Sequence, residues 1–364
     1  MERQGFMPLR FYTRRFIPRM CSVFANMHTP KRVSLFFVLM LVSFLAQAQT
    51  ASYWVFFTDK DQTSFDPYEY FDAKAIERRV RHNVPIAHIT DYPVNVSYVS
   101  KVEQVATDIL GQTRWFNAVA VVATKEQIQY IKQFQFVKKV QPIVAQQILC
   151  SVENDWELSD FHQYVLEKQT LGMQGDLFTK AGFTGKGVRI AIFDGGFPAV
   201  DTHPVFEHVR SANRIVATYD FVKNRPDVYR FSSHGTACMS CITGVYNEQL
   251  MGLAIDAEFL LARTERNTEP FSEEVNWMEA MEWADKNGAQ IISSSLGYTN
   301  NRYFNEDMDG KQALVTRAAN MAASKGILVV TAMGNDGDSE WKYMGAPADA
   351  DSVISVGGLS PRTD

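Results

Sequence analysis

The pattern of apolar and polar positions first indicates a small α+β unit that begins near Tyr53. Short runs rich in β-branched and aromatic residues predict its strands, and longer charged runs predict its helices. Thr124 and Gln127 stand three apart before an apolar run, which is the pattern of a capping box and predicts a helix start. The predicted strands cover 53–58, 94–99, 117–123 and 136–140, and the predicted helices cover 73–80 and 125–132.

A second unit follows the polar stretch at 141–169, and in it strands and helices alternate. The predicted strands cover 188–193, 258–263, 290–296, 327–331 and 353–357, and the predicted helices cover 234–245, 273–287 and 312–325. This alternation is typical of a parallel sheet with helices on both faces, so we expect a three-layer α/β domain. Functional residues of such sheets gather at the carboxyl ends of the strands.

The first 48 residues have the pattern of an export signal. Lys31 and Arg32 precede an apolar or small run from Val33 to Leu45, and 46–48 fits the small-x-small cleavage pattern. The alternative is a membrane anchor, but a span needs roughly 20 apolar residues and this run is shorter. We expect a signal at 1–48 with Met27 as a natural start, and a secreted protein without a permanent membrane span. An α+β domain at 49–150 and an α/β domain at 151–364 are then expected to follow.

Composition and charge change this picture little. A hydrophobic share of 46% and a charged share of 21% are ordinary for globular proteins. The net charge of −5 argues against nucleic acid as a partner. Export permits disulfides, but Cys238 and Cys241 lie three apart on a predicted helix, where their Cβ atoms diverge. We expect both cysteines to be small buried packing residues.

Three polar residues of the second unit suggest a reaction chemistry. Asp194 ends the apolar run at 190–193, His234 opens a helix of small residues, and Asn335 lies on a glycine turn after the predicted strand 327–331. Nucleophilic acyl transfer uses three supporting groups: an acid that orients a histidine, a histidine that acts as base, and an amide that stabilises an oxyanion. The sequence therefore predicts a candidate site made of Asp194, His234 and Asn335.

Simpler interpretations of the same residues remain open at this point. Asp194 and Asn335 also suit turns, and His234 also suits a cap or a core position. His234, Cys238 and Cys241 share one helical face and suit zinc, although no fourth ligand group is evident. The glycines at 182–187 suggest a nucleotide site, but they precede the strand and Lys186 has no Ser or Thr after it, so both phosphate fingerprints fail. We expect no cofactor and leave structural calcium open.

Together these segments resemble the subtilisin-like serine protease family, with the motifs in the family's order. The resemblance covers about 171–358 and includes 190–196, 233–236, 332–335 and 346–348. It implies that Asp194 and His234 are catalytic and that Asn335 is the oxyanion donor. It also implies substrate binding by the residues Ser295, Leu296, Gly297, Ala332 and Gly334.

The resemblance extends to the first unit and has clear departures. The segment before the α/β domain resembles the family's propeptide, which implies two partners: protein or peptide substrates, and the chain's own propeptide. Ala237 stands where the family usually has a second His, and Tyr298 stands where it has a second Gly. No segment after Asn335 matches the nucleophile motif Gly-Thr-Ser-x-Ala-x-Pro.

The missing motif separates two functional hypotheses. The first is a secreted serine endopeptidase whose serine lies beyond residue 364, in which case residues 1–364 alone are expected to be inactive. The alternative is a catalytically inactive subtilisin-like protein that keeps the groove and binds peptides.

Overall fold

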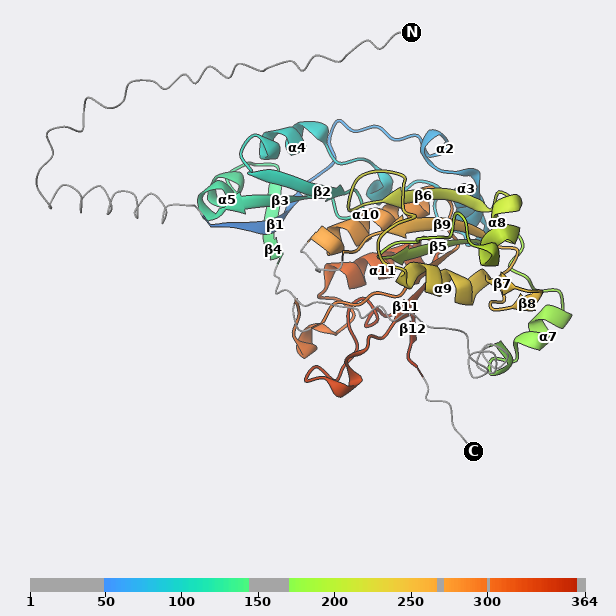
Figure 1. Ribbon diagram of the computed structural model, residues 1–364. Helices are drawn as coiled ribbons and strands as arrows, with labels where there is room; N and C mark the ends of the chain where they lie inside the picture. Colours follow the sequence, from blue (N-terminus) through green and yellow to red (C-terminus); the bar gives the residue numbers. More distant parts are fainter. Residues whose placement is uncertain (1–48, 144–169, 267–271, 300–301, 359–364) are drawn as a thin grey trace, which may run out of the picture. The chain divides into compact units, whose positions relative to one another are not determined.

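The computed structural model describes residues 49–143, 170–266, 272–299 and 302–358 (Figure 1), and the described residues from Thr50 onward belong to one compact unit. The predicted export signal at 1–48 and the predicted domain boundary at 150 lie outside the described residues. In the described part of the chain, no helix has the length and apolar character that crossing a membrane requires.

The N-terminal domain, residues 50–143, contains a four-stranded antiparallel sheet with the order β2-β3-β1-β4. Helices α4 and α5 pack on one face of this sheet, and the Thr124–Gln127 capping box predicted from the sequence begins α5. The strands are β1 (Thr50–Phe57), β2 (Asp108–Thr113), β3 (Ala118–Thr124) and β4 (Val137–Ile143). The helices are α2 (Pro67–Tyr70), α3 (Ala73–Arg81), the 3-10 turn η1 (Ile89–Asp91), α4 (Val96–Glu103) and α5 (Lys125–Ile131).

Strand β1 is buried on both faces because its alternate residues enter two different cores. Val55 and Phe57 pack with Val102 of α4 and Ile128 of α5 inside the N-terminal domain. Trp54 and Phe56 belong to the core cluster that includes the helices α10 (Ser272–Lys286) and α11 (Leu314–Ser324) of the second domain. One face of the N-terminal sheet is therefore buried against the other domain.

The prediction of a strand at 94–99 is wrong, because helix α4 begins within these residues. The side chain of Asn95 accepts hydrogen bonds from the backbone N–H groups of Ser97 and Tyr98, at 2.8 and 3.4 Å. An N-cap of this kind satisfies donors at the start of a helix. Tyr98, Val99 and Val102 then share the buried face at helical spacing, a pattern that the short alternating run concealed.

The C-terminal domain, residues 170–358, contains a parallel six-stranded sheet with the order β12-β11-β10-β5-β9-β6. The five strands predicted for this domain are confirmed, and β6 was missed. The strands are β5 (Arg189–Asp194), β6 (Ile215–Asp220), β9 (Glu258–Arg263), β10 (Ile291–Ser294), β11 (Leu328–Ala332) and β12 (Ile354–Val356). A separate hairpin joins β7 (Val245–Tyr246) and β8 (Gln249–Leu250).

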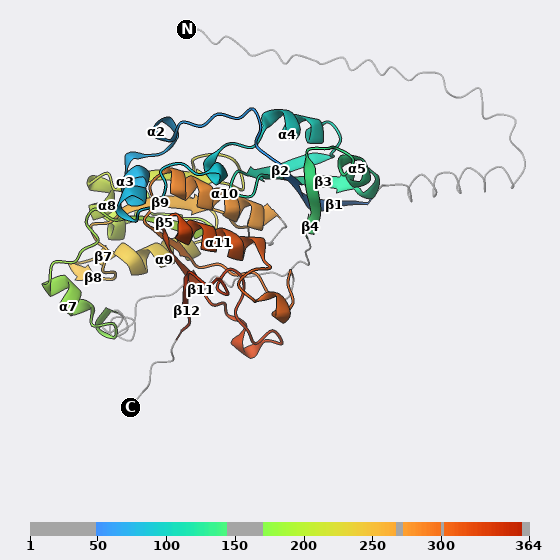
Figure 2. The ribbon, with the colours of Figure 1, turned by 180° about the vertical axis from the view of Figure 1, so that it is seen from behind.

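Helices cover both faces of the parallel sheet, as the sequence predicts (Figure 2). Ala191 and Phe193 of β5 pack toward α10 and α11, whereas Ile190 and Ile192 pack toward Met239 of α9 and the segment around α8. The helices of this domain are α7 (Gly175–Lys180), α8 (Glu207–Ser211), α9 (His234–Thr243), α10 (Ser272–Lys286) and α11 (Leu314–Ser324). The 3-10 turns are η2 (Pro204–Phe206), η3 (Asn305–Asp307) and η4 (Asp336–Asp338).

Three neighbouring strands deliver the predicted site residues to one edge of the sheet. Asp194 is the last residue of β5, Ser295 follows β10, and Asn335 follows β11 by a short turn. Because β5, β10 and β11 are adjacent and parallel, these positions share the carboxyl edge where α/β sheets carry their sites.

Candidate active site

Asp194 is a buried carboxylate at the centre of the sheet edge. Its residue is only 1% exposed, and the backbone N–H of Gly195 donates to its Oδ1 at 2.7 Å. A buried carboxylate needs further hydrogen-bond donors to offset the loss of water. The second donor is the ring of His234.

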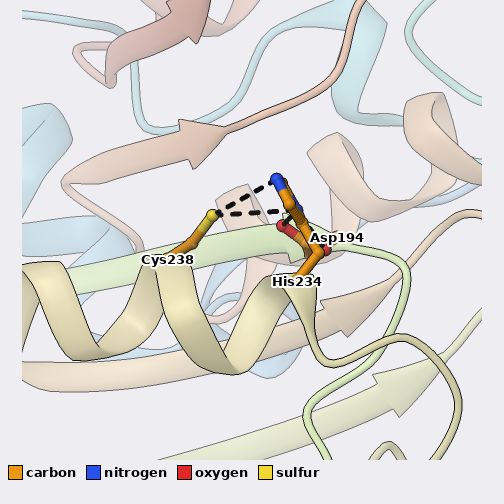
Figure 3. Close-up of side chains that lie close together, drawn as sticks. All are labelled: Asp194, His234 and Cys238. Atoms are coloured by element: carbon orange, nitrogen blue, oxygen red, sulfur yellow. Dashed lines mark hydrogen bonds and ion pairs between the residues drawn. The ribbon is translucent and has the colours of Figure 1, made fainter. Parts of the chain in front are cut away.

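His234 begins helix α9 and directs its ring at Asp194 (Figure 3). Its Nδ1 lies 3.0 Å from Oδ1 and 2.9 Å from Oδ2 of Asp194. Since an ionised carboxylate only accepts hydrogen bonds, Nδ1 carries the hydrogen and Nε2 is left as the acceptor. The side chain of His234 is 55% exposed, so a substrate or nucleophile can reach the ring. This pairing favours the catalytic interpretation over a simple cap or turn.

Two glycines allow the backbone segments that carry Asp194 and His234 to approach each other. A Cβ on Gly235 would lie 2.4 Å from the carbonyl oxygen of Gly196 and 2.8 Å from the Cβ of Asp194. Gly196 has a φ of +151°, and a Cβ there would lie 2.2 Å from the carbonyl oxygen of Arg230. Larger side chains at either position would push the histidine loop away from the strand end.

Cys238 corrects the expectation that both helix cysteines are buried packing residues. Cys238 is half-buried and Cys241 is exposed. The Sγ of Cys238 lies 3.8 Å from Nδ1 and 4.0 Å from Nε2 of His234 (Figure 3). The same Sγ lies 3.2 Å from Oγ of Ser295. The thiol therefore connects the histidine to the segment after β10, a role that the i, i+4 spacing on the helix permits.

The zinc alternative is not supported by the positions of its proposed ligands. In the part of the chain that the structure describes, the His, Cys, Asp and Glu side chains close enough to share an ion are Asp194, His234 and Cys238. Cys241, the third ligand suggested by the sequence, is not in this group. The third member of the group is Asp194, whose carboxylate already pairs with Nδ1 of His234 in the arrangement of an orienting acid.

The surroundings of His234 favour its charged form. The hydrogen bond to Asp194 is the largest cause, followed by the interaction with Cys238, and together they raise the pKa of His234 despite partial burial. A histidine must be neutral to accept a proton, so activity that depends on His234 should increase as the pH rises through its pKa.

We predict that Cys238→Ala moves the pKa of His234 down toward the usual value, because the ring loses one of the two groups that favour its protonated form. The measurement is an NMR titration of the His234 ring in residues 1–364, with the resonance assigned by its loss in His234→Gln. Cys241→Ala, which changes an exposed thiol on the same helix, is the control and should leave the titration unchanged. Equal midpoints in all three proteins would show that the thiol does not influence the histidine.

Arg263 is a positioning residue that the sequence reasoning missed. It ends β9 directly opposite Asp194, and its Nε donates to the carbonyl oxygen of Gly195 at 3.0 Å. The guanidinium pairs with buried Asp220 at 3.0 Å and stacks 3.5 Å from the ring centre of Phe231, which lies on the loop before His234. Arg263 thus holds both loops of the Asp–His pair, and its place at a strand end was the available signal.

The segment after β10 leaves its backbone accessible. The side chain of Leu296 is buried, whereas Gly297 is exposed and a Cβ there would meet nothing within 4 Å. Tyr298 then pairs with Ala346 through two backbone hydrogen bonds of 2.8 and 2.9 Å. The pairing brings the 346–348 segment beside the predicted substrate strand. Any contact of Leu296 with a peptide would therefore be made by its backbone.

Asn335 is exposed on the turn that follows β11. Ala332 ends that strand, and Gly334 has a φ of +107°, a conformation that favours glycine. In the described residues, no hydrogen bond joins Asn335 to Asp194 or His234 directly. The shared sheet edge is what relates Asn335 to the pair.

Comparison with known proteins identifies matches for both domains. Residues 52–155 match the Peptidase S8 propeptide domain of Bacteroidota, and residues 185–364 match the Subtilase family. An alkaline protease from Alkalihalobacillus alcalophilus is 24% identical over 267 residues, which are 70% of this chain and 64% of that protein. Subtilisin BL from Lederbergia lenta is 30% identical over 177 residues, which are 48% of this chain and 57% of that protein. The chain thus spans roughly three fifths of the length of these relatives.

The fold agrees with these sequence matches. The epidermin leader peptide processing serine protease from Staphylococcus aureus superimposes with a TM-score of 0.55 at 16% identity, over 85% of this chain and 70% of that one. The expected three-layer domain with a preceding propeptide-like domain is therefore confirmed. The chain is a member of the subtilase family, with a Peptidase S8 propeptide domain followed by a subtilase domain.

Proposed function

We propose that this protein is an exported serine endopeptidase in which His234 is the general base, Asp194 orients it, and Asn335 stabilises the oxyanion. The observation that carries the proposal is the pairing of Nδ1 of His234 with buried Asp194 at 2.9 and 3.0 Å. That pairing fixes the ring tautomer and leaves Nε2 as an acceptor. The family membership and the relatives support a serine protease function at the level of reaction class.

The reaction that fits this site is acyl transfer through a serine. His234 takes the proton of the serine hydroxyl on Nε2 as the oxygen attacks the peptide carbonyl carbon. The carbonyl π electrons move onto oxygen, and the amide N–H of Asn335 donates to the resulting oxyanion. When the tetrahedral intermediate collapses, the C–N bond breaks and His234 gives its proton to the leaving amine. Water then releases the acyl group by the same steps.

We also propose that a substrate binds as an added strand along Ser295–Gly297. The exposed backbone at Gly297 has open space beside it, which suits main-chain pairing with an extended peptide. Ala332 ends β11, the strand paired with β10, and Gly334 follows it on the next turn. Both residues would border the same peptide. Recognition through backbone groups is compatible with many peptide sequences.

The propeptide domain is proposed to bind and inhibit the peptidase domain until it is removed. Its sheet already shares a core with α10 and α11 through Trp54 and Phe56. Export would be directed by the predicted signal at 1–48 and would place this maturation outside the cytoplasm.

The role of Asn335 is tested by Asn335→Ala in the protein expressed from its native gene. We expect kcat to fall by about 10²–10³-fold with little change in KM, a size carried over from the corresponding asparagine of subtilisin. Because the amide donates as charge develops on oxygen, its loss should weaken the transition state and leave substrate binding intact. Asn305→Ala, an asparagine on η3, is the control. A rise in KM with unchanged kcat would make Asn335 a ground-state contact and contradict the assignment.

A further inference from the structure

We propose that residues 58–95 form a docking arm that binds the end of the peptidase sheet where its parallel strands start. The arm would hold the propeptide domain on the peptidase domain through contacts separate from those at the active-site end of the sheet. The arm is the segment between β1 and α4 and contains α2, α3 and η1. The inference rests on the proposed propeptide role of the N-terminal domain and adds a second binding surface to it. That surface is distinct from the sheet face that covers α10 and α11.

The arm contacts the turns from which the parallel strands start. The backbone N–H of Asp72 donates to the carbonyl oxygen of Lys286, the last residue of α10 before the turn to β10, at 2.8 Å. Lys74 donates to the carbonyl oxygen of Gly187 at 2.7 Å, and Asp72 lies 3.0 Å from the guanidinium of Arg189 at the start of β5. Asp194 ends that same strand, about 16 Å further along at the rise of an extended chain. The arm therefore binds the edge opposite the candidate active site.

A buried cluster of charged side chains joins the arm to the peptidase domain. Arg79 lies between two carboxylates, with Asp91 of the arm at 3.0 Å and Asp285 of α10 at 2.7 Å. Lys325, at the end of α11, pairs with Asp91 at 2.6 Å, and Arg78 pairs with Asp285. The five side chains are each no more than 5% exposed.

Three of the four ion pairs in this cluster form between the two domains, and only the Arg79–Asp91 pair lies within the arm. Asp285 and Lys325 belong to the peptidase domain, and their ionic partners Arg78, Arg79 and Asp91 belong to the arm. Arg78 also donates to backbone carbonyls of the peptidase domain at Ala289 and Lys325. A buried charge without an ionic partner is strongly unfavourable. Each domain therefore supplies the opposite charges that the other domain's buried side chains need.

The turns of the peptidase domain are shaped to admit the arm. A Cβ on Gly288 would lie 2.7 Å from the Cβ of Lys74 and 3.0 Å from the backbone nitrogen of Ala75. A Cβ on Gly326 would lie 3.1 Å from the ring of His82. Both turns thus leave room for α3 to pack close to the start of the sheet.

Lys60 ties the arm back to the propeptide domain. Its Nζ donates to the backbone carbonyls of Ile89, Thr90 and Tyr92 in the arm, at 2.9, 3.2 and 2.5 Å. The same Nζ lies 2.7 Å from the carbonyl oxygen of Arg114, in the turn between β2 and β3, so its three N–H groups are shared among four carbonyl oxygens. Lys60 therefore links the arm to the propeptide sheet, so that release of the sheet together with the arm would break the ionic cluster.

The test measures association of the two domains after the covalent link is cut. A site for a sequence-specific protease is inserted between residues 144 and 169 of the full chain, and the folded protein is cleaved. Dissociation of the two halves is followed by fluorescence on dilution. We expect Arg79→Met and Asp285→Asn each to raise the dissociation constant roughly 10²–10³-fold, because both remove the buried Arg79–Asp285 pair that joins the two halves. Asp285→Asn also leaves Arg78 without its carboxylate partner. The double variant should lose less than the product of the two, since both act through one pair.

Arg81→Ala is the matched control, because Arg81 lies on the same helix but pairs with Glu77 where both side chains are more than half exposed. It should change the dissociation constant less than about fivefold. If Asp285→Asn fails to fold, Arg79→Met decides the question with the peptidase domain unaltered. Unchanged affinity in Arg79→Met, or separation of the wild-type halves at once on cleavage, would overturn the docking arm. Neither readout depends on peptidase activity, so failure of the proposed catalytic function would be seen separately.

Discussion

Replacing His234 by alanine is expected to lower kcat by about 10⁶-fold, a size carried over from the corresponding histidine of subtilisin. The structure gives the physical reason. His234 is the imidazole whose Nδ1 is fixed by a buried carboxylate and whose ring remains half exposed at the carboxyl edge of the sheet. Without it, no group in the proposed mechanism takes the proton from the serine. The measurement is the hydrolysis rate of a chromogenic peptide at saturation, with the protein expressed from its native gene.

A matched control distinguishes loss of the base from loss of the fold. His208→Gln changes a histidine that contacts Thr243 at the other end of α9, and it should retain nearly full activity. KM should change little in His234→Ala, because the ring acts on the transition state more than on the bound peptide. Activity within tenfold of wild type in a folded His234→Ala protein would contradict its role as the base.

Asp194→Asn is expected to lower kcat by about 10⁴-fold. An asparagine amide is nearly the same size as the carboxylate, but its NH₂ group can turn toward Nδ1 and favour the wrong ring tautomer. The pKa of His234 should fall at the same time, since the hydrogen bond to Asp194 is the main cause of its elevation. Peptide hydrolysis gives the first effect, and the NMR titration of the His234 ring gives the second.

Asp256→Asn provides the comparison for this variant. Asp256 precedes β9 at the amino end of the sheet and forms a partly exposed pair with Arg214 at 2.8 Å, so it should affect activity little. A fall in kcat without any fall in the pKa of His234 would mean that Asp194 acts in some way other than through the ring.

The sequence predicted the parallel sheet and the Asp–His pair because their signals are local. Apolar runs that end at a carboxylate mark a buried strand and its carboxyl end, and strands that alternate with helices indicate a parallel sheet. Asp194 and His234 stand 40 residues apart in the chain, yet each sits at the end or start of a regular element, so the fold brings them together.

Other parts of the structure depend on contacts that a linear pattern does not contain. A short alternating run predicted a strand at 94–99, but the cap made by Asn95 begins helix α4 there. The thiol of Cys238 faces His234 instead of the core, and helix periodicity alone does not tell which side is covered. The docking arm depends on charges from Arg79 to Lys325, whose partners lie in different domains. Long-range pairing of this kind is invisible to local propensity.

The central claim, that His234 and Asp194 activate a serine for attack on a peptide bond, is tested most directly with a fluorophosphonate probe. The probe forms a covalent bond with a serine oxygen whose proton is removed by a neighbouring base. Mass spectrometry of the protein expressed from its native gene should find one modified serine after removal of the propeptide domain, and His234→Ala should abolish that adduct. No adduct on the folded wild-type protein, or equal labelling of the His234→Ala variant, would contradict the account.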